Sequence, residues 1–299
     1  MVRYGWWAVA GAMAIAMPAK VEGQITSGRL AVLTLESTIF GNTRKLRVWL
    51  PEAYDDPLRA EDSFPVLYLN DGQNLFDPAT ALFGDTEWRV DETVAWLIET
   101  GQIEPVVVVG IDNAGARGRA REYLPYPDEF LDPPEPNPQG TRYSDFLAEE
   151  ALPLTEQRFR VRRERSGRTL GGSSYGALVS LYVAVQRPDL FANLLLESPS
   201  LYVDDQRVLD DAALTGVGVD RIYIGVGTNE LAIEGCAPHP GNEEAVQHVY
   251  RLESILRARG LKEQDVFVRV EECAVHKESA WADRLPSALQ FLFHRRGTR

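Results

Sequence analysis

Two adjacent serines stand in the stretch Gly172-Ser173-Ser174-Tyr175-Gly176, which matches the pattern G-x-S-x-G. The pattern is typical of a nucleophilic serine on a sharp turn between a strand and a helix, although small residues at a helix start also produce it by chance. Glycine is needed two residues before and two residues after the nucleophile, because a side chain at either place would clash with nearby backbone. Ser174 meets this requirement, whereas Ser173 is followed two residues later by Tyr175. We therefore predict that Ser174 is the nucleophile and that Ser173 is a residue of the turn.

A serine hydroxyl becomes nucleophilic when a histidine accepts its proton and a carboxylate orients that histidine. Where the serine lies on a strand-to-helix turn, the chain order is serine, acid, histidine. The chain has four histidines, and His276, in "ECAVHKESAW", follows the last predicted strand, as this order requires. We predict His276 as the base. The other three lie in a loop rich in proline and glycine, inside a predicted helix, and near the end of the last helix: His239, His248 and His294.

The acid is expected after the strand that precedes the histidine, in the loop "GTNE" that follows Arg221–Val226. Glu230 is the first carboxylate of this loop, and we predict that it orients His276. Glu234 is the next carboxylate and stays an alternative. If the site has no orienting acid, both are ordinary solvated charges.

Acyl transfer also needs backbone N–H groups that hold the oxyanion, and the loss of one donor slows such a reaction by roughly 10²–10³. Tyr175, the residue after the predicted nucleophile, supplies one donor. We place the second at Gln73, in the loop Asn70–Asn74 after the third predicted strand, where Gly72 permits close approach of the backbone. This loop has a second interpretation as a plain turn, which an Asp-Gly pair suits equally well.

Strand and helix patterns alternate along the chain, which predicts βαβ units. We expect a mostly parallel central sheet with helices on both faces and an antiparallel N-terminal edge. Residues 114–141 are rich in proline, glycine and arginine, and we expect them to form an irregular rim loop. The predicted strands are Leu30–Glu36, Lys45–Leu50, Pro65–Asn70, Pro105–Ile111, Arg168–Leu170, Asn193–Leu196, Arg221–Val226 and Asp265–Val270. The predicted helices are Asp91–Thr100, Asp145–Phe159, Ser174–Gln186, Glu243–Arg259 and Ala280–His294.

The first 23 residues differ from the rest of the 299-residue chain. A basic start, an apolar centre too short to span a bilayer and small residues after it are typical of a secretory signal peptide. Cleavage is expected after Ala16, Ala19 or Gly23. We expect residues 24–299 to form a single domain, exported to the periplasm or the extracellular space. The alternative is an ordinary N-terminal helix. We expect no later span of a membrane.

The composition is that of an ordinary globular protein, with 44% hydrophobic and 25% charged residues. The formal net charge of −13 disfavours nucleic acid and anionic membrane surfaces as partners, because no basic stripe is available to meet phosphate groups.

With these residues placed, the chain resembles the putative-esterase family of α/β-hydrolases, which includes enterochelin, feruloyl and acetyl-xylan esterases. The similarity is carried by "YLNDGQNLFD", "EWRVDE", "VVVVGIDN", "REYLPY", "LGGSSYGALVSLY", "ESPS", "GTNE" and "HKESAW", which span about residues 40 to 293. "DGQNLFD" points to the enterochelin-esterase-like branch. Two positions depart from the family pattern: Ala177 stands where a second glycine is common, and Glu230 aligns with an acid that is often aspartate.

The two cysteines, Cys236 and Cys273, lie close in sequence to the predicted acid and base. In an exported protein they are expected to form a disulfide that ties the two loops together. It would close a loop of about 38 residues, worth roughly 3–4 kcal/mol. The competing pattern is a pair of C-x-x-H motifs, completed by His239 and His276, which would bind zinc and remove His276 from catalysis.

These residues and the resemblance predict a secreted serine esterase that forms an acyl-enzyme on Ser174 and needs no metal or organic cofactor. The expected substrate is a small-molecule or polysaccharide-linked ester, as in siderophore or feruloyl esterases. An acyltransferase with the same residues and a non-catalytic binding protein are the alternatives. Four aromatic side chains fit either a substrate pocket or the core: Trp88, Tyr123, Tyr126 and Phe130. Three arginines fit either a site for an anionic substrate or a solvated loop: Arg117, Arg119 and Arg121.

Overall fold

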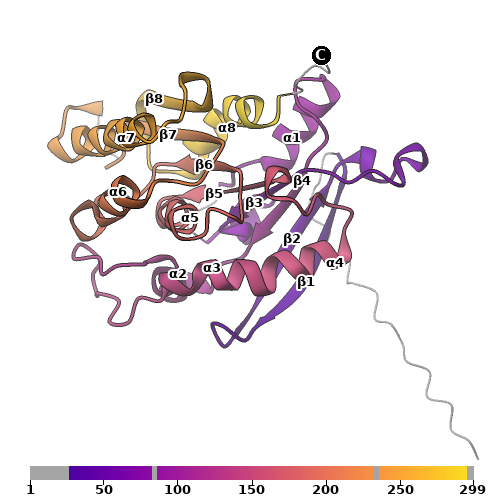
Figure 1. Ribbon diagram of the computed structural model, residues 1–299, viewed down its shortest axis with the longest axis horizontal. Helices are drawn as coiled ribbons and strands as arrows, with labels where there is room; N and C mark the ends of the chain where they lie inside the picture. Colours follow the sequence, from indigo (N-terminus) through magenta and orange to yellow (C-terminus); the bar gives the residue numbers. More distant parts are fainter. Residues whose placement is uncertain (1–26, 83–85, 232–235, 295–299) are drawn as a thin grey trace, which may run out of the picture.

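Short apolar runs form the centre of the sheet in the computed structural model, which describes residues 27–82, 86–231 and 236–294 (Figure 1). Eight strands of these described residues form one sheet in the order β1-β2-β4-β3-β5-β6-β7-β8. The first two strands and β4 pair antiparallel, and all other neighbours pair parallel. The strands are β1 (Arg29–Ser37), β2 (Asn42–Leu50), β3 (Val66–Asn70), β4 (Val107–Ile111), β5 (Arg168–Ser173), β6 (Asn193–Glu197), β7 (Arg221–Asn229) and β8 (Val266–Val275).

Helices cover both faces of the sheet (Figure 1). The main helices are α1 (Val90–Glu99), α2 (Gly115–Tyr123), α3 (Tyr143–Phe146), α4 (Leu152–Arg158), α5 (Tyr175–Gln186), α6 (Val203–Thr215), α7 (Pro240–Ala258) and α8 (Glu278–Phe293). A π-helical turn, Leu147–Ala151, joins α3 to α4. Short 3-10 turns lie at Glu52–Tyr54, Pro57–Arg59, Gly72–Asn74, Pro78–Thr80, Gly140–Arg142, Arg165–Gly167 and Glu263–Asp265.

Successive side chains of β3 enter different hydrophobic cores, because neighbouring residues of a strand point to opposite faces. Val66 and Tyr68 belong to the core under helices α2 to α7, whereas Leu67 and Leu69 belong to the core under α1 and α8. The middle strands are therefore buried on both faces, which explains their uninterrupted apolar sequence. The α/β-hydrolase architecture predicted from the sequence, with its antiparallel edge, is confirmed.

Three elements differ from the sequence prediction. Helix α2 occupies the first part of the segment expected to be irregular, and buried contacts of Arg119 and Tyr123 hold it despite Gly115 at its start and Gly118 inside it. Helix α6 was not predicted, because few apolar positions mark its buried face. Strand β8 extends to Val275, since it pairs with β7 as far as Asn229. The predicted signal peptide lies outside the described residues.

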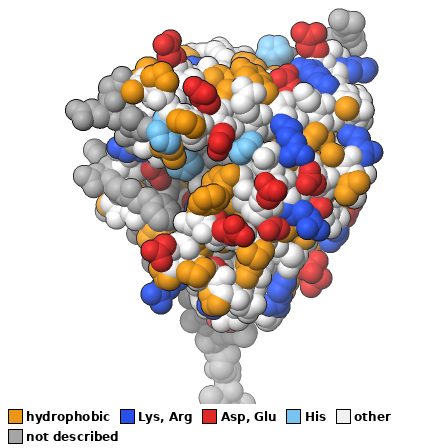
Figure 2. Space-filling model, turned by 90° about the vertical axis from the view of Figure 1, so that its left-hand side faces the viewer, with side chains coloured by type: hydrophobic (Ala, Val, Ile, Leu, Met, Phe, Trp, Pro, Cys, Tyr) orange, Lys and Arg blue, Asp and Glu red, His pale blue; other side chains and the backbone are white. Residues whose placement is uncertain are grey.

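Positive and negative side chains are interspersed on the face shown in Figure 2. None of the helices in the described ranges is long and apolar enough to cross a membrane.

The carboxyl group of Asp91 is buried at the start of α1. Asp91 is 1% exposed, and neither of its carboxyl oxygens has a hydrogen-bond partner among the described residues. Burial, together with the nearby charge of Glu92, raises the pKa of Asp91 to about 8. In the unfolded chain this group has a pKa of about 3.9. The folded state therefore binds the proton more tightly, and Asp91 makes the protein less stable as the pH rises from about 4 to about 8.

We predict that Asp91→Asn raises the melting temperature at pH 9 by about 2 °C or more, because the buried negative charge is removed. The gain should shrink towards pH 5, where the folded protein already holds the proton. Thermal unfolding across this pH range measures both effects, with Glu61→Gln, an exposed carboxylate, as control. An equal gain at pH 5 and pH 9 would contradict the argument.

Candidate active site

Ser174 lies at the apex of a sharp turn between β5 and α5. Its backbone has φ 55° and ψ −124°, a conformation that non-glycine residues rarely adopt. Such a turn lifts a side chain off the end of a sheet and exposes it to a ligand. Ser173 instead ends β5 and is buried, and its carbonyl accepts a hydrogen bond from Arg119.

Close packing explains the two glycines that flank this turn. A Cβ atom on Gly172 would lie 3.1 Å from Cβ of Asn70 and 3.0 Å from the carbonyl carbon of Gly176. A Cβ on Gly176 would lie 3.2 Å from the same Asn70 atom. Any larger residue at either place would push the turn away from β3, so the spacing noted in the sequence is a packing requirement of Ser174.

His276 and Glu230 come together at the carboxyl ends of β8 and β7. Nδ1 of His276 lies 2.6 Å from Oε2 of Glu230. The glutamate side chain is 8% exposed and the histidine side chain is 35% exposed. Burial acts to raise the pKa of Glu230, but the hydrogen bonds and charge from His276, with the donors Gly227 N and Ser198 Oγ, lower it below its usual range. Glu230 is therefore an ionised hydrogen-bond acceptor for the imidazole.

Ser174 and His276 line the same cleft, which has a volume of about 700 Å³. They also line a smaller hollow of about 290 Å³, where Tyr202, Val226 and Leu231 form part of the wall. The hydroxyl of Ser174 lies 3.3 Å from Oγ of Ser200. No hydrogen bond joins Ser174 Oγ to His276, both of which are described residues.

The two positions predicted to hold an oxyanion lie on the turn segments around the cleft. Gln73 is in the 3-10 turn Gly72–Asn74, and Asp71 and Asn74 on either side of it line the cleft. The side-chain oxygen of Gln73 accepts a hydrogen bond from the backbone N–H of Asn113. Tyr175 is the first residue of α5. Their roles stay predictions.

Arg119 lies in the cleft, a placement that the sequence left open between site and solvated loop. It is 8% exposed and forms two hydrogen bonds of 2.8 Å with Asp71. Burial acts to lower the pKa of Arg119, but the charge and hydrogen bonds of Asp71 raise it. A fixed guanidinium therefore stands beside Ser173 at the wall of the cleft. Its neighbours Arg117 and Arg121 are exposed.

The other candidates from the sequence lie elsewhere. His239 caps the start of α7, His248 lies within α7, and His294 follows α8. Glu234 lies outside the described residues. Trp88 and Tyr123 belong to the two cores, whereas Phe130 is 80% exposed and packs against Tyr202.

The sequence pattern of the family described as "Putative esterase" matches residues 37–292. The chain belongs to this family. A siderophore enterobactin esterase from Emericella nidulans is 26% identical over 197 residues, which cover 58% of this chain and 63% of that protein.

Solved structures show the same fold. The crystal structure of an IroE-like serine hydrolase from Shewanella oneidensis has a TM-score of 0.67 at 22% identity, over 89% of this chain and 80% of that one. A ferulic acid esterase has a TM-score of 0.64 at 18% identity, over 89% of this chain and 98% of that one.

A disulfide joins Cys236 to Cys273 in this member of the putative esterase family, as the sequence predicted. The zinc alternative needs both cysteines as thiolates, so it is incompatible with this bond. The disulfide connects the segment after β7 to β8 itself, three residues before His276. It therefore links covalently the two chain segments that carry Glu230 and His276.

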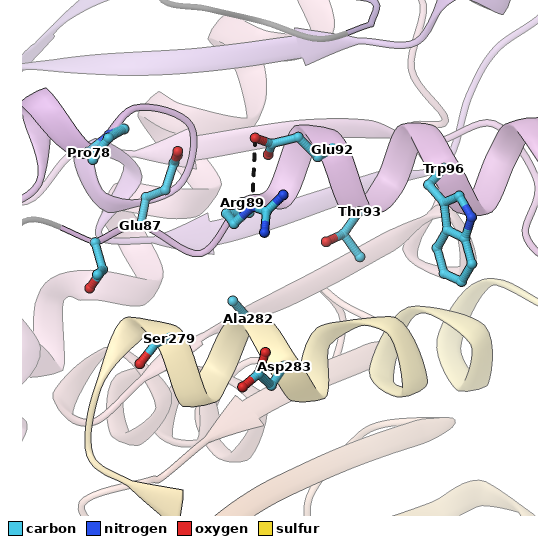
Figure 3. Close-up of a pocket in the computed structure, with 10 residues that line it drawn as sticks. Pro78, Glu87, Arg89, Glu92, Thr93, Trp96, Ser279, Ala282 and Asp283 are labelled. Carbon is cyan, nitrogen blue, oxygen red and sulfur yellow. Dashed lines mark ion pairs between the residues drawn. The ribbon is translucent and has the colours of Figure 1, made fainter.

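A second hollow of about 590 Å³ lies between α1 and α8 and shares Thr86 and Ser279 with the cleft. Figure 3 shows Trp96 on α1 and Asp283 on α8, and the ion pair of 3.9 Å between Arg89 and Glu92. Burial, with the charges of Glu92 and Asp77, raises the pKa of Glu87, another lining residue, to about 7. Three carboxylates, Glu87, Glu92 and Asp283, and one guanidinium, that of Arg89, line this hollow, which we call the acidic groove.

We predict that the double variant Cys236→Ser/Cys273→Ser loses roughly 3–4 kcal/mol of unfolding free energy, because the unfolded chain regains the freedom of the loop that the bond closes. Urea denaturation under non-reducing conditions measures this loss. Reduction of the wild type should reproduce it, and the same reductant should leave the double variant unchanged. Equal stability of wild type and double variant would show that the bond does not constrain this part of the chain.

Proposed function

We propose that the protein is a serine esterase that hydrolyses a carboxylic ester through an acyl-enzyme on Ser174. The observation that carries the proposal is the hydrogen bond between His276 and Glu230 in the cleft that Ser174 lines from its strained turn. Membership of the putative esterase family supports it.

In the proposed reaction, the hydroxyl of Ser174 turns from Ser200 towards Nε2 of His276, which accepts its proton as Oγ attacks the ester carbonyl. Glu230 accepts the hydrogen bond from Nδ1 and stabilises the imidazolium that forms. This rotation suits a site that tightens only when substrate binds. His276 then gives the proton to the leaving alcohol, and a water molecule repeats the sequence to release the acid.

The negative oxygen of the tetrahedral intermediate needs donors that are already in place. We propose the backbone N–H groups of Gln73 and Tyr175, which lie on the two turns beside Ser174. Every proton transfer in this sequence is made by a side chain of the site or by water. The chemistry therefore needs no metal or organic cofactor.

Ser174 and His276 line both the cleft and the smaller hollow, and spaces of unequal size suit an ester with two parts of unequal size. We propose that the larger cleft, with Arg119 in its wall, takes the bulkier part and that the smaller, more apolar hollow takes the other. The acidic groove disfavours a negative charge on any part of the substrate that extends past Thr86. A siderophore lactone and a feruloyl or sugar ester are both candidates, and we propose that the protein is exported, which the disulfide favours.

The same residues would perform acyl transfer if an alcohol replaced water in the second half of the reaction. Product analysis in the presence of excess alcohol separates these activities. A non-catalytic binding protein would show no labelling of Ser174 by a fluorophosphonate, a reagent that reacts with activated serines.

We predict that Ser174→Ala abolishes both hydrolysis of p-nitrophenyl acetate and fluorophosphonate labelling, because no nucleophile remains. Ser173→Ala is the matched control, since it removes the neighbouring hydroxyl on the same turn, and it should keep most of the activity. Initial rates and mass spectrometry of the labelled chain measure the two effects. Loss of activity in Ser173→Ala with activity kept in Ser174→Ala would contradict the prediction and identify Ser173 as the nucleophile.

We predict that salt affects neutral and anionic esters differently. The net charge of −13 and the acidic groove repel an anionic substrate, and salt screens this repulsion over about 10 Å at 0.1 M. The kcat/KM for a catecholate trilactone should therefore rise with salt, while that for methyl ferulate stays constant. Rates at several NaCl concentrations test this, and a fall for the trilactone would instead show that Arg119 dominates its binding.

A further inference from the structure

Ser198 is a buried residue directly after β6 that none of the steps above uses. It is 4% exposed, and its backbone has a positive φ of 43°. Its N–H donates to the carbonyl of Gly225 on β7, 2.8 Å away. The hydroxyl is thereby held at the carboxyl end of the sheet, under the loop that carries Glu230.

Three groups contact the hydroxyl of Ser198, and their chemistry determines where its proton points. The indole Nε1 of Trp281 lies 2.9 Å from Oγ, and Nη2 of Arg284 lies 3.4 Å from it. Both of these groups can only donate, so they occupy the lone pairs of the hydroxyl. The third contact is Oε1 of Glu230, at 2.8 Å, which can only accept when ionised. The hydroxyl proton therefore has one direction, towards Glu230.

This bond divides the carboxylate of Glu230 into two oxygens with different tasks. Oε1 accepts from Ser198 and from the backbone N–H of Gly227, which lies 2.5 Å away. Oε2 is left for Nδ1 of His276. A glutamate has one more rotatable bond than an aspartate, and two donors on one oxygen remove this extra freedom.

Trp281 contacts both ends of the same chain of bonds. Its N–H donates to Ser198, and its ring packs against the imidazole of His276 in a T-shaped arrangement, with centroids 5.2 Å apart and planes at 84°. The donor Arg284 is itself fixed by an ion pair of 2.7 Å with Glu197, and both side chains are fully buried. The hydroxyl of Ser198 thus stands on a support whose own side chains are held by buried contacts.

We propose that Ser198 and Trp281 are positioning residues that orient Glu230 towards His276 and so activate Ser174. The inference rests on the proposed function, because it assigns a role within that proton transfer. Trp281 also lines the cleft and Ser198 the smaller hollow, so a direct effect on substrate binding has to be separated from positioning. The effect of a positioning residue must pass through Glu230. That requirement separates a positioning role from a contribution to stability alone.

The test is a double-mutant cycle between Ser198→Ala and Glu230→Ala, read as the rate of fluorophosphonate labelling of Ser174 and as kcat for p-nitrophenyl acetate. Ser198→Ala should slow both by ~10- to 100-fold, since a hydrogen bond to a charged group is lost, while KM stays within about twofold. In the Glu230→Ala background the same change should cost less than about twofold. Equal losses in both backgrounds would overturn the inference.

Two further variants keep the result clear if Ser198→Ala unfolds. Ser198→Gly removes the hydroxyl and suits the positive φ, so it should fold and show the same loss of activity. Trp281→Phe keeps a ring against His276 and removes only the N–H, and it should slow labelling by about threefold or more. Normal labelling rates in both folded variants would contradict the proposal.

Matched controls remove a buried serine hydroxyl and a buried indole N–H at residues that do not line the cleft. Ser37→Ala removes a buried hydroxyl that accepts from Phe40 N, and Trp49→Phe removes an indole N–H that donates to the carbonyl of Ser27. Both should label at the wild-type rate. If the wild type is not labelled at Ser174, the proposed function is wrong, and so is the inference that rests on it. A labelled wild type with an additive cycle would overturn the inference alone.

Discussion

The positive φ of Ser174 is the constraint on which the rest of the site depends. A non-glycine residue in such a conformation costs on the order of 1–3 kcal/mol, so neighbouring structure must hold it. Its N–H donates to the carbonyl of Glu197 at 3.0 Å. The amide of Asn70 donates to the carbonyl of Gly176 at 2.9 Å, and Tyr143 donates to the same amide's oxygen at 2.5 Å. Residues of β3, β6 and α3 thus stabilise one turn.

The parallel sheet brings the remaining groups to this turn. The carboxyl ends of parallel strands meet at one edge of the sheet, so segments after β3, β5, β6, β7 and β8 converge there although they are far apart in sequence. This geometry explains why the order of the predicted strands was enough to predict that His276 and Glu230 lie near each other. It also explains why the fold was predictable from alternating strands and helices: both faces of the middle strands must be covered, and only helices between them can do so.

The features that the sequence did not reveal depend on contacts between distant segments. Arg119 lies in a glycine-rich stretch typical of a solvated loop, and only its pairing with Asp71 across the sheet end brings it into the cleft. Helix α2 follows from the same contacts rather than from its own weak helical propensity. Ser198 and Trp281 are 83 residues apart, and neither has a neighbour in sequence that indicates their bond. Such pairings carry no local pattern, so a single sequence cannot show them.

Helix α8 gives the site a dependence on helical register. Trp281 and Arg284 are three residues apart on one helix, and therefore project from the same side towards Ser198. The helix begins two residues after His276. One residue added between His276 and Trp281 would rotate both donors by about 100° around the helix axis, away from the hydroxyl. The length of this short connection is thus as much a part of the geometry proposed for the site as the identity of the side chains, and substitutions are easier to accommodate here than insertions or deletions.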